Sequence, residues 1–334
     1  MLNKNIAING VGRIGKNVFR HYFEQAPTDC NLQAINLGVN HIAAKLHLLQ
    51  YDSIHGKAPV KIEQVMEDSI VVNGQKIKLI KEIDINNINW AEHNVDLVLE
   101  CTGSFNNRTA AYKHIQQGAQ KVIVSAPCAN ADSTIVIGAN DDHLTALHKV
   151  ISIGSCTTNC LAPVAKILDD AFTIESGFVT AIHACTNDQN IVDASHKDLR
   201  RARSASMSMI PTTTGAAESI GVVLPNLAGK LSGAAVRVPT QNVSMIDFVF
   251  NTKKSVSEDE INELFKNYWN KNIVDFVNIP LVSIDHNHST ASAIFDCLET
   301  RVVQNNMARI LSWYDNEWAF SCRMLELAQR VIKL

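Results

Sequence analysis

The chain has 334 residues, of which 46% are hydrophobic and 19% charged, and its formal net charge is -3. This is an ordinary globular composition, and the length allows two domains that each bury a core. A weak negative charge gives no general attraction for nucleic acid or anionic membranes. No apolar run approaches the roughly 18 residues that span a bilayer, and Met1–Gly15 lacks the pattern of a secretion signal. We therefore expect a cytoplasmic protein without membrane contact.

Short apolar runs alternate with helical patterns over the first half of the chain. A helix is expected at residues 13–25, and a hairpin at residues 69–80, where Asn73-Gly74 separates two strand-like runs. Apolar strands without polar alternation are typical of a parallel sheet that is covered on both faces. The other expected strands are residues 5–9, 32–36, 96–100, 121–125, 134–138 and 150–153.

After residue 155 the expected strands become longer. A capping box that starts at Ser257 opens an amphipathic helix to about Trp269, and residues 317–334 form a last helix that is expected to pack onto the first domain. The strands are expected at residues 178–184, 234–238, 243–250, 292–297 and 308–313. The pattern predicts an α/β protein: a Rossmann-type doubly wound parallel sheet (residues 1–155 and 317–334) plus an α+β domain with a mostly antiparallel sheet (residues 156–316).

A glycine-rich segment, Gly10-Val-Gly12-Arg-Ile-Gly15, follows the first strand and opens the first helix. The glycines allow a tight turn, a close approach of pyrophosphate and close helix–strand packing, and the helix N-terminus offers N–H groups to phosphate. A plain turn is the alternative for an isolated G-x-G-x-x-G, but the βαβ context favours a dinucleotide site. Where NAD sites place a carboxylate for the ribose, this chain has Leu37. That change indicates relaxed or NADP-favouring selectivity, or loss of the acid without gain of NADP affinity.

Cys156 stands out among the eight cysteines, most of which are expected to be small buried hydrophobes. It lies where a strand leads into an apolar helix, and the positive helix end is expected to stabilise thiolate and lower its pKa. Ser155 and Thr157 place hydroxyls beside it. Cys160, one turn later, either packs inward or has a redox role. His183, at the end of an apolar strand, is a candidate base.

A cationic segment at residues 197–203 is either a solvated face or part of an anion site. Threonines 212–214 and Arg237 favour the second reading, because arginine forks and hydroxyls bind phosphates well. The cysteine spacing matches no zinc or haem motif, so no metal is expected.

Several segments resemble the phosphorylating glyceraldehyde-3-phosphate dehydrogenase family along nearly the whole chain: INGVGRIGKNVFR, YDSIHGK, SCTTNCLAP, HKDLRRAR, TTTGAAESIGVVLPNLAGKLSG, VRVPTQNVSMIDF and SWYDNEW. The resemblance implies that Cys156 is the nucleophile and His183 the base. It implies a homotetramer, with residues 156–316 as the catalytic and tetramerisation domain. It also implies that Thr186 and Arg237 hold the substrate C3 phosphate, and that inorganic phosphate is held by Ser155, Thr157, Arg201, Thr214 and Gly215.

The same resemblance implies a nicotinamide cofactor site. Leu37 replaces the aspartate of NAD-type members, and Ala194-Ser195 replaces Leu-Pro, as in NADP-using members, so Ser195 would approach the neighbour's 2′-phosphate. Against this, the arginine usual near the adenine is missing beside Ile83, although Lys81 could substitute. We favour NADP or dual use over strict NAD. The implied cofactor residues are Asn9, Gly10, Gly12, Arg13, Ile14, Gly15, Leu37, Lys81, Thr102, Gly103, Ser125, Ser195 and Asn316, the last for the nicotinamide carboxamide.

The expected reaction is the reversible phosphorylating oxidation of D-glyceraldehyde 3-phosphate to 1,3-bisphosphoglycerate, through a thiohemiacetal and a thioester on Cys156. An erythrose-4-phosphate dehydrogenase is the nearest alternative, because substrate chain length cannot be read from the residues. A redox-sensing or RNA-binding protein is an alternative of another class. Against it stand the intact catalytic residues and the lack of a basic stripe or an aromatic stacking platform, so no dedicated nucleic-acid site is expected.

Overall fold

The computed structural model describes residues 4–270 and 272–334, which form two compact units. Unit 1 contains the described residues up to Ile135 together with Asp141–Gly154 and Ser321–Leu334. Unit 2 contains Val136–Asn140 and Ser155–Phe320. Within the described part of the chain, no helix is long and apolar enough to cross a membrane.

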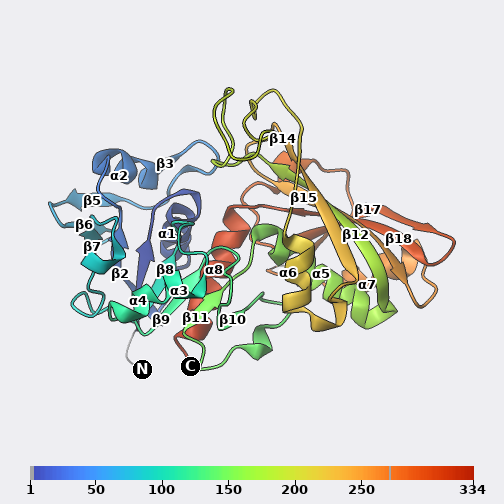
Figure 1. Cartoon of the computed structure of the whole chain (residues 1–334), viewed down its shortest axis with the longest axis horizontal. Helices are drawn as coiled ribbons and strands as arrows, with labels where there is room; N and C mark the ends of the chain where they lie inside the picture. Colours follow the sequence, from blue (N-terminus) through green and yellow to red (C-terminus); the bar gives the residue numbers. More distant parts are fainter. Residues whose placement is uncertain (1–3, 271) are drawn as a thin grey trace. The chain divides into compact units, whose positions relative to one another are not determined.

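A nine-stranded sheet forms the centre of unit 1 (Figure 1). Its strand order is β10-β11-β9-β8-β1-β2-β7-β6-β5, and all pairs are parallel except β7 with β6 and β6 with β5. Successive residues of β8 are all buried, which confirms a sheet covered on both faces. The strands are β1 Lys4–Asn9, β2 Cys30–Asn36, β5 Ile62–Val65, β6 Ser69–Val72, β7 Gln75–Ile80, β8 Leu97–Glu100, β9 Lys121–Val124, β10 Ser133–Thr134 and β11 Val150–Ser152.

Two sequence predictions for the first half of the chain have opposite outcomes. The hairpin is confirmed, because β6 and β7 pair antiparallel around Asn73 and Gly74, both at positive φ. The strand at residues 134–138 is wrong beyond Thr134. Residues 135–137 are buried, but the chain then turns: Asn140 Oδ1 accepts from Val136 N at 2.8 Å, and Gly138 has φ 86°. The apolar run reflected burial and not extended pairing.

The helices of unit 1 flank this sheet, and the last of them comes from the far end of the sequence. Ser321 Oγ donates to Ile14 O at 3.5 Å, and Gln329 Nε2 donates to Asp29 Oδ1 at 3.0 Å. The helices are α1 Arg13–Gln25, α2 Ile42–Gln50, α3 Arg108–Ala111, α4 Lys113–Gln116 and α8 Trp318–Val331, and a short ribbon pairs β3 Tyr51–Asp52 with β4 Gly56–Lys57.

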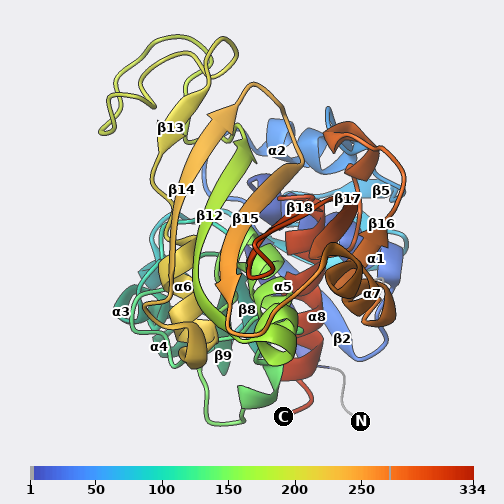
Figure 2. The same ribbon diagram turned by 90° about the vertical axis from the view of Figure 1, so that its right-hand side faces the viewer.

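Unit 2 contains a seven-stranded sheet in the order β13-β14-β12-β15-β18-β17-β16, mostly antiparallel as expected (Figure 2). The pairs β12–β14 and β16–β17 are parallel. Burial alternates along β15, which is typical of a sheet with one face on a core and one face open. The strands are β12 Ile174–Ala184, β13 Ile210–Thr212, β14 Leu231–Val238, β15 Ser244–Thr252, β16 Val274–Val277, β17 Ala293–Val303 and β18 Met307–Tyr314.

Three helices fill the covered face of this sheet: α5 Cys156–Phe172, α6 Ala216–Val223 and α7 Glu258–Asn267. Leu161 and Leu168 of α5 join Phe248 of β15 and Phe265 of α7 in one buried cluster. The capping box at Ser257 is present, because Glu260 N donates to Ser257 Oγ while Ser257 N donates to the Glu260 carboxylate. This packing fixes the N-terminal end of α5 relative to β12 and β14.

Candidate active site

Cys156 is the first residue of α5. Ser155 is the N-cap, and its hydroxyl accepts from Thr158 N at 3.0 Å. This bond satisfies one of the donors that a helix start leaves unpaired, and it turns the thiol toward the positive end of the helix. Ser155 therefore has a structural function, whatever anion it also binds.

His183 faces this thiol from the penultimate residue of β12. Its Nε2 lies 3.5 Å from Cys156 Sγ, and its side chain is buried. Arg237 is its direct neighbour on β14, as the register of the parallel pair requires. His183 Nδ1 lies 2.7 Å from Ala184 O and 2.8 Å from Arg237 Nη1. Because an arginine can only donate, Nδ1 either accepts from Arg237 or carries a proton that it donates to Ala184 O.

The charges of this group favour a neutral pair. Burial raises the pKa of the Cys156 thiol, although the positive charge of Arg237 and bonds from Thr157 oppose the rise. Burial and the charge of Arg237 lower the pKa of His183 to about 4. The sequence reasoning expected a lowered thiol pKa, whereas burial, the largest cause, raises the pKa of Cys156. At neutral pH, a thiol faces an uncharged imidazole.

Tyr314 completes the group and was missed by the sequence reasoning. Its hydroxyl lies 2.8 Å from Thr157 Oγ1, and its ring meets that of His183 edge-on, with 6.1 Å between centroids. Both Thr157 and Tyr314 are buried. The signal was available in the segment SWYDNEW, where Tyr314 ends β18 and alternation turns it to the covered face.

The predicted phosphate-binding residues lie on the segments beside this group. Arg201 donates from Nε and Nη2 to Thr212 Oγ1 at 3.0 and 2.8 Å and pairs with Asp188, and its charge helps to lower the pKa of His183. The other predicted residues have local functions. Thr186 N donates to Gln189 Oε1 at 3.3 Å, Thr214 Oγ1 accepts from Ala216 N at 3.2 Å, and Gly215 is the N-cap of α6.

Two cofactor residues predicted from the resemblance belong to unit 2. Asn316 is buried, and its Oδ1 accepts from Ser244 Oγ at 2.8 Å, which leaves its amide nitrogen as the group that can donate to a ligand. Ser195 is exposed on the loop between β12 and β13.

The glycine-rich turn of unit 1 fits a dinucleotide phosphate. A Cβ at Gly15 would stand 1.9 Å from Gly10 O, so only glycine fits there, and no described atom lies within 4 Å of a Cβ at Gly12. No side chain in the described ranges caps the start of α1 at Gly12. Open space in front of uncapped N–H groups is what a pyrophosphate requires. Two other predicted cofactor residues have local partners, since Ser125 N donates to Glu100 O and Arg13 pairs with Asp52. The remaining predicted cofactor residues of unit 1 near this turn are Asn9, Ile14, Thr102 and Gly103.

The loop after β2 carries Leu37, the position that the resemblance links to cofactor selectivity. Leu37 is buried, and its N donates to Ile80 O at 2.8 Å. Lys45 of α2 donates to Leu37 O and stands 3.5 Å from a Cβ at Gly38. Lys45 is thus a cation beside the position from which the carboxylate is missing, and the sequence reasoning did not find it.

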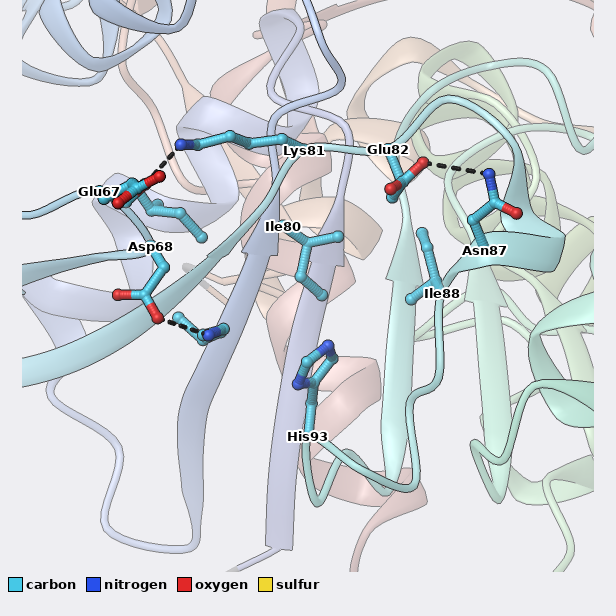
Figure 3. Close-up of a pocket in the computed structure, with 10 residues that line it drawn as sticks. Glu67, Asp68, Ile80, Lys81, Glu82, Asn87, Ile88 and His93 are labelled. Carbon is cyan, nitrogen blue, oxygen red and sulfur yellow. Dashed lines mark hydrogen bonds and ion pairs between the residues drawn. The ribbon is translucent and has the colours of Figure 1, made fainter.

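Lys81 is exposed, and its ammonium donates to Glu67 O (Figure 3). It lines a shallow pocket of about 420 Å³ with Lys78, His93 and others. Within this pocket Lys78 pairs with Asp68 at 2.7 Å. Over the described ranges, no group of three His, Cys, Asp or Glu side chains could hold a metal ion.

Two family descriptions match the chain: glyceraldehyde 3-phosphate dehydrogenase, NAD binding domain, over residues 4–108, and the C-terminal domain of the same enzyme over residues 155–316. The chain belongs to the glyceraldehyde-3-phosphate dehydrogenase family. It is 47% identical to glyceraldehyde-3-phosphate dehydrogenase 2 of Bacillus subtilis over 98% of this chain and 96% of that one. It is 48% identical to the enzyme of Xanthobacter flavus over 100% of both chains, and 47% identical to that of Geobacillus stearothermophilus over 97% and 96%.

Membership of this family, together with the two folds above, makes the chain an oxidoreductase of the NAD(P)-dependent phosphorylating class, with a nicotinamide cofactor. The sequence prediction of the family, of the enzyme class and of both sheet types is confirmed.

Proposed function

We propose that the chain converts D-glyceraldehyde 3-phosphate, inorganic phosphate and NAD(P) reversibly into 1,3-bisphosphoglycerate, with Cys156 as nucleophile and His183 as base. The observation that carries the proposal is the 3.5 Å approach of His183 Nε2 to Cys156 Sγ at the start of α5. A thiol within reach of an imidazole that a third group orients is the arrangement for covalent catalysis.

The first step is attack of Cys156 on the aldehyde carbon. His183 Nε2 takes the thiol proton, the sulfur bonds to the carbonyl carbon, and His183 then gives this proton to the former carbonyl oxygen, which becomes the hydroxyl of a thiohemiacetal. His183 then takes the proton of that hydroxyl as the carbon gives up hydride, which leaves a thioester on Cys156. When bound, the nicotinamide ring supplies the acceptor for this hydride. Inorganic phosphate attacks the thioester carbon, and the thiolate of Cys156 leaves.

Arg237 connects substrate binding to this proton transfer. His183 accepts a proton at Nε2 as a base only when its own proton is on Nδ1, where it donates to Ala184 O. The C3 phosphate, held by Arg237 and Thr186, draws the guanidinium away from Nδ1 and so favours this tautomer. Arg201 and Thr214, together with Gly215 and the hydroxyls of Ser155 and Thr157, hold the attacking phosphate.

For the cofactor, the proposal is NADP or dual use. Leu37 offers no acceptor to a ribose 2′-hydroxyl and no charge to repel a 2′-phosphate, and Lys45 adds a cation beside this loop. Ser195 supports the same preference in an assembled enzyme. Asn316 binds the carboxamide of the nicotinamide.

A homotetramer is part of the proposal. Ile191, Val192, Leu199, Met207 and Met209 of the loop between β12 and β13 are 71–86% exposed in the single chain. Apolar side chains gathered on one loop support burial against another copy. A single-chain mass in light scattering at working concentration would contradict this part.

The test is initial-rate kinetics with glyceraldehyde 3-phosphate, comparing kcat/KM for NAD and NADP with and without inorganic phosphate. Phosphate-dependent turnover is expected, with NADP at least equal to NAD. A turnover rate that does not depend on inorganic phosphate would contradict the proposed phosphorylating reaction. A kcat/KM for erythrose 4-phosphate above that for glyceraldehyde 3-phosphate would change the proposed substrate but not the proposed chemistry.

A further inference from the structure

Glu100 is a buried carboxylate at the centre of unit 1 that none of the steps above uses. It ends β8, is 1% exposed, and lies between β9 and β1 in the sheet. The register pairs Glu100 with Asn9 of β1, and Asn9 with Asn36 of β2. These three polar residues therefore end three adjacent strands at one level of the sheet. Burying a charge is costly unless several donors satisfy it.

Both carboxylate oxygens of Glu100 accept hydrogen bonds from several donors. Oε2 accepts from Asn9 Nδ2 at 2.5 Å and from His114 Nε2 at 3.0 Å. Oε1 accepts from Thr102 N at 2.6 Å and from the Thr102 hydroxyl. Trp90 Nε1 donates to His114 Nδ1 at 3.1 Å, which keeps the proton of this imidazole on Nε2, facing the carboxylate.

The carboxylate also fixes the orientation of both asparagines. A carboxylate only accepts, so Asn9 turns its amide nitrogen to Glu100 and its oxygen to Asn36, whose Nδ2 donates to it at 2.7 Å. Asn36 Oδ1 is thereby directed at the loops, where it accepts from Gly38 N at 3.0 Å and Glu82 N at 3.1 Å. The backbone at the far end favours the same orientation, because the N–H groups of Gly38 and Glu82 can only donate and Asn36 Nδ2 also donates to Glu82 O at 2.9 Å. We call the bonds that run from Glu100 through Asn9 to Asn36 the relay.

The two ends of the relay reach the two halves of the proposed cofactor site. At one end Thr102 packs on the first glycine of the phosphate turn, since a Cβ at Gly10 would stand 2.7 Å from Thr102 Cγ2. At the other end Gly38 follows Leu37 on the ribose loop and has φ 65°. A ligand that spans both loops binds more tightly when they are already ordered, because ordering them then costs nothing on binding.

We propose that Glu100 is a positioning residue for the cofactor, whose carboxylate holds the phosphate turn and the ribose loop in their binding positions through Thr102 and the Asn9–Asn36 relay. This inference rests on the proposed location of the cofactor. Glutamine at position 100 would keep the shape but turn an amide nitrogen toward two of the present donors, so the relay could no longer be satisfied.

The test is direct binding of NAD and NADP to the full-length Glu100→Gln protein by calorimetry, without substrate. The dissociation constant is expected to rise about tenfold or more, while kcat at saturating cofactor and alkylation of Cys156 stay within about twofold of wild type. Amide exchange at Thr102 and Gly38 should become faster. Tyr22→Phe is the matched control, because it removes a buried hydroxyl that accepts from Leu32 N at 3.0 Å at the opposite end of β2.

An unchanged dissociation constant in a folded Glu100→Gln protein, or an equal rise in Tyr22→Phe, would overturn the inference. Should Glu100→Gln not fold, Asn36→Ala leaves the charge in place and cuts the relay beyond Asn9. Its affinity for adenosine diphosphate should fall at least about threefold with faster exchange at Gly38, and unchanged values would also overturn the inference. If the wild-type protein binds neither NAD nor NADP, that result would instead contradict the proposed function.

Discussion

The thiol site of unit 2 and the cofactor end of unit 1 are built differently. In unit 2, the side chains of the proposed catalytic site meet directly: Cys156 starts a helix, and His183 and Arg237 are paired neighbours on two strands. In unit 1, backbone and glycines form the proposed binding surface, and Glu100, Asn9 and Asn36 form a buried row of hydrogen-bonded side chains at the ends of the strands. We therefore expect loss of a side chain in the proposed site of unit 2 to stop the reaction, and loss of a side chain in the row of unit 1 to weaken cofactor binding.

Of the variants considered, Cys156→Ser is expected to reduce the rate of aldehyde oxidation most. A serine hydroxyl is a far weaker nucleophile than a thiol at neutral pH, so aldehyde oxidation should fall by about 10⁴-fold or more. Cofactor binding, measured by calorimetry, should stay within about twofold. Substantial residual oxidation would remove Cys156 from the mechanism.

His183→Asn should slow the reaction by about 10²- to 10⁴-fold, the usual contribution of a general base. Stopped-flow measurement of the acylation step checks this, with His143→Asn, an exposed histidine of unit 1, as control. A variant that acylates at the wild-type rate would show that another group takes the thiol proton.

The pH dependence of thiol reactivity tests the neutral pair. Since the pKa of Cys156 is raised and that of His183 is lowered to about 4, the thiolate fraction should grow about tenfold per pH unit from pH 6 to 8. Alkylation of Cys156 by iodoacetamide in the ligand-free enzyme measures this fraction. A plateau across that range would mean that thiolate and imidazolium are already formed.

The smallest effect concerns cofactor choice in unit 1. Leu37→Asp should raise the preference for NAD over NADP about tenfold, because a carboxylate accepts from the ribose hydroxyl and repels a 2′-phosphate. The ratio of kcat/KM values for the two cofactors measures it. Leu37→Asn separates charge from polarity, and an equal shift in both variants would argue against repulsion as the cause.

The sequence predicted the thiol site and the phosphate turn because both are local motifs. Cys156 and the glycines at 10, 12 and 15 lie in short segments whose spacing has a physical reason. Tyr314 and Glu100 were missed because each bonds to a residue that is distant in the sequence: Tyr314 bonds to Thr157, and Glu100 bonds to Asn9. Lys45 was missed although it bonds to Leu37, only 8 positions earlier, because it belongs to none of the motifs. The strand expected at residues 134–138 failed for a related reason, since burial alone does not separate a strand from a buried turn.

The C-terminal helix has a consequence for the way the protein folds during synthesis. Residues 321–334 belong to the same compact unit as β1 and α1, and Ser321 and Gln329 bond to residues about 300 positions earlier. The part of unit 1 that precedes residue 155 therefore leaves the ribosome before α8, which completes this unit only after unit 2 has been synthesised. Such a chain exposes apolar surface while residues 155–320 are made, so a partner that shields it, such as a chaperone, should raise the yield of native protein.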